Sequence, residues 1–139
     1  AVANDSSGEP ALQCTSRGSP KETTLNRNMQ PILKGVETFQ VMYGLDTNGD
    51  SIPRHWVSGH NITAADWVKV VAVRVGLVIR GDVGSSQGAS ATAAENDFYP
   101  LGKVFTGNST EAGLKYTAPN DGRLRRVFNA TFKLRNSQD

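Results

Sequence analysis

The sequence predicts an α+β fold built on a mostly antiparallel sheet of four to five strands. Segments with the period-2 alternation of a half-buried strand recur between residues 35 and 135, and the candidate helices are only one or two turns long. The predicted strands carry one apolar face, which another element must cover. Because the short helical turns cannot cover it, we expect a helix that lies upstream of this chain to do so. A second sheet made by the same strands is the alternative.

The first quarter of the chain, residues 1–34, is predicted to be a polar N-terminal segment. It is rich in Ser, Thr, Asn, Gly and Pro, and every aromatic residue of the chain follows it. Such a composition supplies little core, and three prolines interrupt any longer helix. We therefore expect a tail or an irregular surface segment with one short helical turn near residues 25–28. A globular β domain is expected to follow over residues 35–139.

The first strand of this domain is predicted over residues 39–45, where apolar side chains occupy every second position. Residues 46–50 (DTNGD) end it, because Asp and Asn side chains bond back to their own backbone and Gly tolerates a positive φ. A returning strand is predicted over residues 52–58, although Pro53 weakens it.

A helical turn is predicted over residues 63–67, with Thr63 as its N-cap. The strongest strand signal follows over residues 71–79. One face of this strand is fully apolar, and it consists of Val71, Val73, Val75, Leu77 and Ile79. The other face mixes small, apolar and basic residues. This pattern is typical of an interior strand.

Residues 81–97 are nearly all small or polar and predict a long loop, a kind of segment that is usually functional or mobile. A short strand is predicted over residues 98–105. Residues 115–117, a turn at residues 120–122 and the segment from Arg123 onward predict a hairpin. The apolar face of its last strand consists of Phe128, Ala130, Phe132 and Leu134.

Composition excludes several classes of protein. The chain has 139 residues and a net charge of +2, which excludes a histone-like polycation. Its single cysteine, Cys14, excludes a disulfide framework within this chain and a Cys-rich zinc module. Cys14 is then either free or paired with a cysteine outside this sequence. No apolar run approaches the roughly 20 residues of a membrane-spanning helix. Because the chain begins at Ala1 rather than Met, we expect it to be processed or cut.

Asp46, Asn48 and Asp50 have the alternating spacing of a calcium loop, in which successive oxygens point inward. The positions that an EF-hand fills with Gly and a bidentate Glu hold other residues here, which excludes an EF-hand. A calcium site would therefore need a further ligand, such as Asp66. The alternative, which the sequence favours, is a tight turn held by hydrogen bonds to the Asp and Asn side chains.

Basic residues crowd the C-terminal segment, and four of them share the predicted outer face of the last strand: Arg123, Arg125, Lys133 and Arg135. We interpret them as a candidate contact with an acidic partner protein. The alternative is a solvated strand face, on which charges also prevent edge aggregation. DNA binding is disfavoured, because it needs a broader basic field with aromatic residues placed among the charges.

The sequence offers no arrangement for catalysis. His55 and His60 are its only histidines, and neither a nucleophile elbow nor a phosphate-binding loop is present. We therefore expect no enzymatic activity. Trp56 and Trp67 are expected in the core or at its rim.

Three blocks of the sequence together resemble a known family. They are residues 35–50 (GVETFQVMYGLDTNGD), residues 66–75 (DWVKVVAVRV) and residues 121–128 (DGRLRRVF), which end in LRN at residues 134–136. In this order the blocks resemble PilW-type minor pilins of Gram-negative type IV pili.

The resemblance implies a pilin-like head whose long hydrophobic N-terminal helix is absent from this chain. In the family this helix holds the subunit in the inner membrane, later packs in the pilus core and covers the apolar face of the sheet. The resemblance also implies a non-enzymatic role at the periplasmic face of the inner membrane and then in the pilus, at its tip. There the protein joins other minor pilins and the major pilin, primes pilus assembly and supports the display of a tip adhesin.

Two alternatives to this interpretation stay open at the level of sequence. One is a minor pseudopilin of type II secretion, which shares the architecture. The other is a β-sandwich module that binds calcium or a glycan. As contact surfaces we expect the loop at residues 81–97 together with the loop at residues 46–50, because loops on a rigid sheet carry variable recognition.

Overall fold

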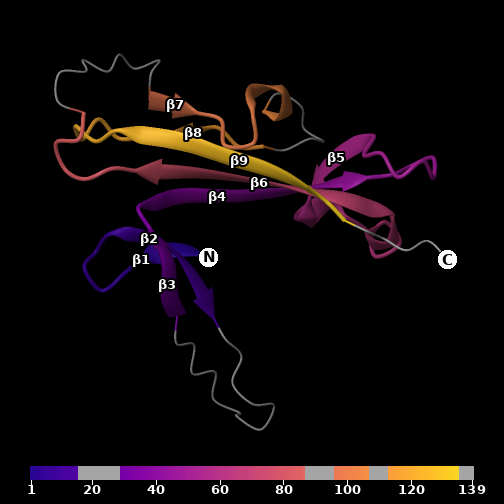
Figure 1. The fold of residues 1–139 in the computed structure, drawn as a ribbon, viewed down its shortest axis with the longest axis horizontal. Coiled ribbons are helices and arrows are strands. Elements are labelled where there is room, and N and C mark those ends of the chain that lie inside the picture. The colour runs from indigo at the N-terminus through magenta and orange to yellow at the C-terminus, as the bar shows by residue number, and fades with distance from the viewer. Residues whose placement is uncertain (16–28, 87–95, 107–112, 135–139) are drawn as a thin grey trace, which may run out of the picture.

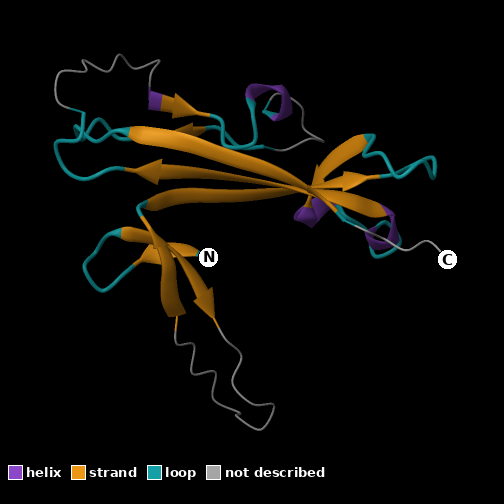
Figure 2. Ribbon diagram, in the orientation of Figure 1, coloured by secondary structure: helices purple, strands orange, loops and turns teal. Residues whose placement is uncertain are grey.

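The structure is a computed structural model that describes residues 1–15, 29–86, 96–106 and 113–134 (Figure 1). The regular structure of the described chain is mostly antiparallel β-strand, arranged in a main sheet, an N-terminal sheet and a small third sheet. The helical elements with defined bounds are short 3₁₀ turns (Figure 2): η1 (Gly59–Asn61), η2 (Trp67–Lys69) and η4 (Lys103–Phe105). None of the described helices is long and apolar enough to cross a membrane.

The α+β prediction is therefore wrong, and the fold is mostly β. The strand patterns were real, but no described stretch of the sequence has the length or the period of an α-helix. The helix was predicted because the apolar face of the strands needs a cover, but the described residues between β6 (Val70–Arg80) and β9 (Arg125–Lys133) pack on the other face of the sheet.

The main sheet contains four antiparallel strands in the order β5–β4–β6–β9. Their bounds are β4 (Val36–Leu45), β5 (His55–Ser58), β6 (Val70–Arg80) and β9 (Arg125–Lys133). These strands confirm the alternation seen in residues 39–45, 71–79 and the C-terminal segment. β5 begins three residues later than predicted, because the turn after β4 extends through Pro53, which cannot donate a ladder hydrogen bond.

The N-terminal sheet has the order β1–β2–β3, with β1 (Val2–Asn4), β2 (Pro10–Thr15) and β3 (Met29–Lys34). The expected tail or irregular segment is thus wrong for the described residues before Gly35. Sheet ladders are made by the backbone and need no aromatic residue. The β1–β2 turn is closed by the Asp5 carboxylate, which accepts hydrogen bonds from the N–H groups of Ser7 at 2.8 Å and Glu9 at 3.1 Å. The helical turn expected near residues 25–28 lies outside the described residues.

Gly35 joins the N-terminal sheet to the main sheet. Its φ of 77° is left-handed, and a Cβ at this position would lie 2.7 Å from the carbonyl oxygen of Arg80. The Gly35 N–H donates to the Pro10 carbonyl at 2.7 Å, and its carbonyl accepts from the Arg80 N–H at 2.8 Å. One residue without a side chain therefore links β2, β3, β4 and β6. Whether residues 34 and 35 also mark a domain boundary stays a prediction.

Residues 96–106 and 113–124, which lie between β6 and β9, cover one face of the main sheet, and we call them the covering segment. This segment contains the third sheet, formed by β7 (Asp97–Phe98) and β8 (Tyr116–Thr117). The Arg74 Nε donates to the Leu101 carbonyl at 2.9 Å, and the Gln40 side chain exchanges hydrogen bonds with the backbone of Leu114 at 2.8 and 2.9 Å. Met42 and Leu101 are buried in this layer. Gly76 allows the contact, because any Cβ there would collide with the backbone of Pro100.

Two expectations for this segment are wrong. Residues 98–105 do not form one strand, because β7 ends at Phe98 and a 3₁₀ turn follows. Residues 115–117 do not pair with the last strand either: β8 pairs with β7, and β9 pairs with β6 along its whole length. The turn at residues 120–122 passes the chain from the cover to the sheet instead of closing a hairpin (Figure 1).

Candidate functional site

The main sheet exposes its more apolar face. The strand register places Phe39 beside Leu77, and Leu77 beside Phe128, on the same side of the sheet. We call this surface the open face, and it consists of Phe39, Val41, Tyr43, Val73, Val75, Leu77, Phe128, Ala130 and Phe132. The exposed fraction is 39% for Phe39, 51% for Phe128 and 56% for Phe132. Contiguous exposed apolar surface of this kind marks an interaction site more often than isolated apolar residues do.

The buried face of the sheet is the mixed one, which carries Ala72, Gly76 and Val78 of β6. The covering segment lies against this face. Its Leu101 carbonyl accepts a hydrogen bond from Arg74, and its backbone at Pro100 packs over Gly76. Arg74, one of the two basic residues on this face of β6, also donates to Thr131 Oγ1 at 3.0 Å and is thus bound within the layer. The sequence therefore distinguished the two faces, but the described residues leave the apolar one open except at Val71, which is buried.

One end of the open face is closed by a small core of Leu45, Val57 and Val70, against which Tyr43 and Ile62 pack. The ring of Trp67 meets that of Tyr43 edge-on with centroids 5.1 Å apart, and Trp67 is 47% exposed. Trp67 thus lies at the rim of this core. Trp56 lies half-buried, with its ring 6.0 Å from that of Phe105.

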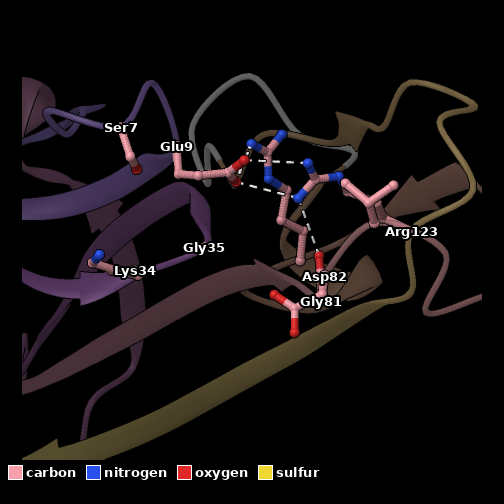
Figure 3. Close-up of a pocket in the computed structure, with 9 residues that line it drawn as sticks. Ser7, Glu9, Lys34, Gly35, Gly81, Asp82 and Arg123 are labelled. Carbon is pink, nitrogen blue, oxygen red and sulfur yellow. Dashed lines mark hydrogen bonds and ion pairs between the residues drawn. The ribbon is translucent and has the colours of Figure 1, made fainter.

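A charged junction lies where the N-terminal sheet meets the main sheet (Figure 3). Glu9 accepts an ion pair from Arg80 at 2.6 Å and another from Arg123 at 3.2 Å. Arg123 also donates to the Gly81 carbonyl at 3.3 Å. The hydrogen bonds from Arg80 and then Arg123 hold the pKa of the Glu9 carboxyl below its ordinary value. A cavity of about 570 Å³ opens beside these groups, also lined by Lys34 and Asp82.

A second, deeper cluster surrounds Arg125. Its guanidinium contacts both carboxylate oxygens of Glu37, at 2.6 and 2.9 Å, and both of Asp121, each at 2.8 Å. The side chains of Arg125 and Glu37 are 3% and 5% exposed. The hydrogen bond from Arg125 lowers the pKa of Asp121 to about 2. Buried charges require such pairing, because desolvation penalises each of them alone.

The basic residues predicted to form one contact surface lie in different surroundings. Arg123 and Arg125 do not form a solvated outer face, since both are engaged in ion pairs on the covered side of the sheet. Lys133 is exposed at the end of β9, and Arg135 lies outside the described residues. A contact of these residues with an acidic partner protein stays a prediction.

The candidate calcium residues Asp46, Asn48 and Asp50 lie in one tight loop. The Asp46 carboxylate accepts backbone N–H groups of Asn48, Gly49 and Ser51 at 3.1, 2.8 and 2.7 Å. Although burial acts in the opposite direction, these donors keep the pKa of Asp46 below its ordinary value. Asp50 is bound by Arg54, Asn48 and the Ile52 N–H. The geometry is that of the expected turn, and calcium binding stays a prediction that a calcium titration with thermal melting tests.

Asp66, the expected extra calcium ligand, is bound within its own turn by Thr63 Oγ1 at 2.6 Å and Lys69 Nζ at 2.9 Å. Within the described ranges, no cluster of three or more His, Cys, Asp or Glu side chains is placed to hold a metal ion. His55, His60 and Cys14 are all exposed.

The sequence profile of the family described as Type IV Pilus-assembly protein W matches residues 1–136. The chain belongs to this family. Comparison with curated proteins and with solved structures gave no significant match. The PilW family assigns the chain to type IV pilus assembly, which suggests a structural role, association with the cell envelope or the pilus, and interaction with other components of pilus assembly. The resemblance seen in the three sequence blocks is confirmed.

For this PilW-family chain, sequence reasoning missed Glu9, Glu37 and Arg80. The sequence did contain a signal for these ion pairs. Arg80 belongs to the mixed face of its strand, and an arginine on a face that becomes covered needs an acidic partner. The partners themselves could not be identified: Glu9 lies 114 positions from Arg123, and Glu37 lies 88 positions from Arg125. Of the two predicted contact loops, residues 46–50 are described, whereas residues 87–95 of the other lie outside the described ranges.

Proposed function

We propose that this chain is a non-enzymatic minor pilin that acts by packing its open face against other subunits of the pilus machinery. It primes pilus assembly in a complex with other minor pilins, joins the major pilin and supports the display of an adhesin at the tip. It acts first at the periplasmic face of the inner membrane and then in the pilus.

The open face is the observation that carries this proposal. Phe39, Phe128 and Phe132 stand on a sheet of four strands, so the surface is rigid and already formed. Because these rings are about half exposed, burial of the rest of one ring against a partner stabilises a complex by about 1 kcal/mol. Membership in a pilus-assembly family supports the choice of partner, because such a protein works through contacts with other subunits.

The test places Phe132→Asp in the complete protein in its own cells, where it puts a charge on the open face. We expect at least about tenfold fewer surface pili by electron microscopy, together with loss of co-purifying minor pilins, because a buried unpaired carboxylate opposes the contact. Val104→Asp is the matched control, since Val104 is 75% exposed on the covering segment. Thermal melting should give the wild-type midpoint for purified Val104→Asp, and a midpoint lower by about 4 °C or less for purified Phe132→Asp.

Normal pili and unchanged co-purification in the Phe132→Asp strain would contradict the proposal. Loss of secreted enzymes with normal pili would instead identify a component of type II secretion.

A further inference from the structure

The outer edge of β9 is a long strand edge that no described residue pairs with. We propose that it binds an extended, acidic segment of a different protein as an additional antiparallel or parallel strand. This goes beyond the proposed function, because it concerns the backbone edge of the sheet and not its open face.

The register identifies which backbone groups of β9 point outward. The Gly81 N–H donates to the Leu124 carbonyl and the Leu134 N–H to the Val71 carbonyl, both at 2.8 Å, at the two ends of the β6–β9 ladder. Hydrogen-bonded pairs alternate along an antiparallel ladder. The backbone groups of Phe128, Ala130 and Phe132 therefore face β6, whereas those of Val127, Asn129 and Thr131 face away from it.

The outward groups have no backbone partner in the described ranges. The opposite edge strand, β5, has four residues, and β3 contains Pro31, which interrupts pairing. β9 has nine residues with neither Pro nor Gly, and most of its side chains are exposed. A strand edge of this length is a template for pairing unless the protein protects it.

The side chains around the edge define the chemistry of the partner strand. On the open face, Phe128 and Phe132 are more than half exposed, so apolar side chains at alternate positions of an added strand would cover them. At the two ends of β9, Arg126 and Lys133 are exposed, and the strand (RRVFNATFK) contains no acidic residue. An added strand with acidic residues near its ends complements both charges.

A second copy of this chain fits the edge less well. Antiparallel self-pairing about Asn129 would bring together two strands that each expose Arg126 and Lys133 and contain no acidic residue. The charge of β9 therefore selects against self-association and in favour of an acidic segment.

The experiment uses the purified chain and a synthetic peptide of the length of β9, with alternating Val and Thr and with Glu at both ends. Amide hydrogen exchange by NMR is measured with and without the peptide. In the free chain, we expect fast exchange at Val127, Asn129 and Thr131 and slow exchange at Phe128, Ala130 and Phe132. Saturating peptide should slow the first set about tenfold or more, because these amides gain partners.

Two variants and two control peptides sharpen the test. Asn129→Pro removes one outward N–H without removing a β6 ladder bond and should weaken peptide affinity about tenfold, whereas Asn129→Ala should change it by less than about twofold. A peptide with Lys in place of Glu, or with a central Pro, should bind about tenfold more weakly. If Asn129→Pro does not fold, the exchange pattern of the wild-type chain decides alone.

The proposal is overturned if the amides of Val127, Asn129 and Thr131 are already protected from exchange in the free chain, or if the peptide binds without protecting them. It is also overturned if their protection rises with protein concentration together with a dimeric mass, since the occupant is then a second copy. None of these results alters the pilus counts of the Phe132→Asp strain, so failure of this inference and failure of the proposed function are distinguishable.

Discussion

Arg125 is the residue that binds the C-terminal strand to the rest of the molecule. Its side chain is 3% exposed and bridges Glu37 at the start of β4 to Asp121 in the turn before β9. A planar guanidinium can satisfy two carboxylates at once, which a lysine ammonium cannot do with the same geometry. The three groups form a unit in which each charge is compensated only while the other two are present.

We predict that Arg125→Ala lowers the free energy of unfolding by about 3 kcal/mol, because it leaves the Glu37 carboxylate buried without its partner. Urea denaturation followed by circular dichroism measures the change. Arg126→Ala is the matched control and should stay within about 0.5 kcal/mol of wild type, since Arg126 is exposed. Equal effects of the two substitutions would contradict the buried role of Arg125.

At the scale of elements, the covering segment decides which face of the main sheet is buried. The strands β4, β6 and β9 could be predicted from sequence, because the alternation that defines them is local. The cover could not, because it consists of two-residue strands and turns held by single contacts such as that of Arg74 with Leu101. The strands before Gly35 were missed for a related reason, since their stability depends on pairing with each other and not on an apolar pattern.

Because one face of the main sheet is covered and the other is open, two substitutions of large apolar residues should lower the free energy of unfolding by unequal amounts. Met42→Ala, on the covered face, should cost about 3 kcal/mol, because the fully buried side chain leaves a cavity. Phe132→Ser, on the open face, should cost about 1 kcal/mol or less, because more than half of the ring is already in water. Urea denaturation of both variants measures the difference. A larger cost for Phe132→Ser would mean that the open face is buried in the isolated chain.

At the scale of the whole molecule, ionised aspartates hold connections in separate parts of the fold. Ser7 binds Asp5 in the N-terminal sheet, Arg54 binds Asp50 after β4, and Arg125 binds Asp121 before β9. These hydrogen bonds lower the pKa of each carboxyl from 3.8 to about 2. Protonation at low pH therefore weakens all three connections over the same range.

Thermal stability should consequently depend on pH below about pH 4. Because the folded-state pKa of these groups lies below the unfolded value, their contribution is complete above about pH 4 and is lost as the pH falls toward about 2. The midpoint of thermal unfolding, measured by calorimetry, should be level from pH 7 to about 4 and then fall. Asp121→Asn should reduce the fall. A loss of stability centred near pH 6 would be inconsistent with this origin.

The joint at Gly35 limits how this sequence can change over evolutionary time. A side chain of any kind would meet the carbonyl of Arg80, and even asparagine, which tolerates a left-handed backbone, has the Cβ that collides. Loops elsewhere in the chain can lengthen or change composition without disturbing the sheets. Position 35, in contrast, admits a single amino acid, so lineages that diverge everywhere around it should still share this glycine.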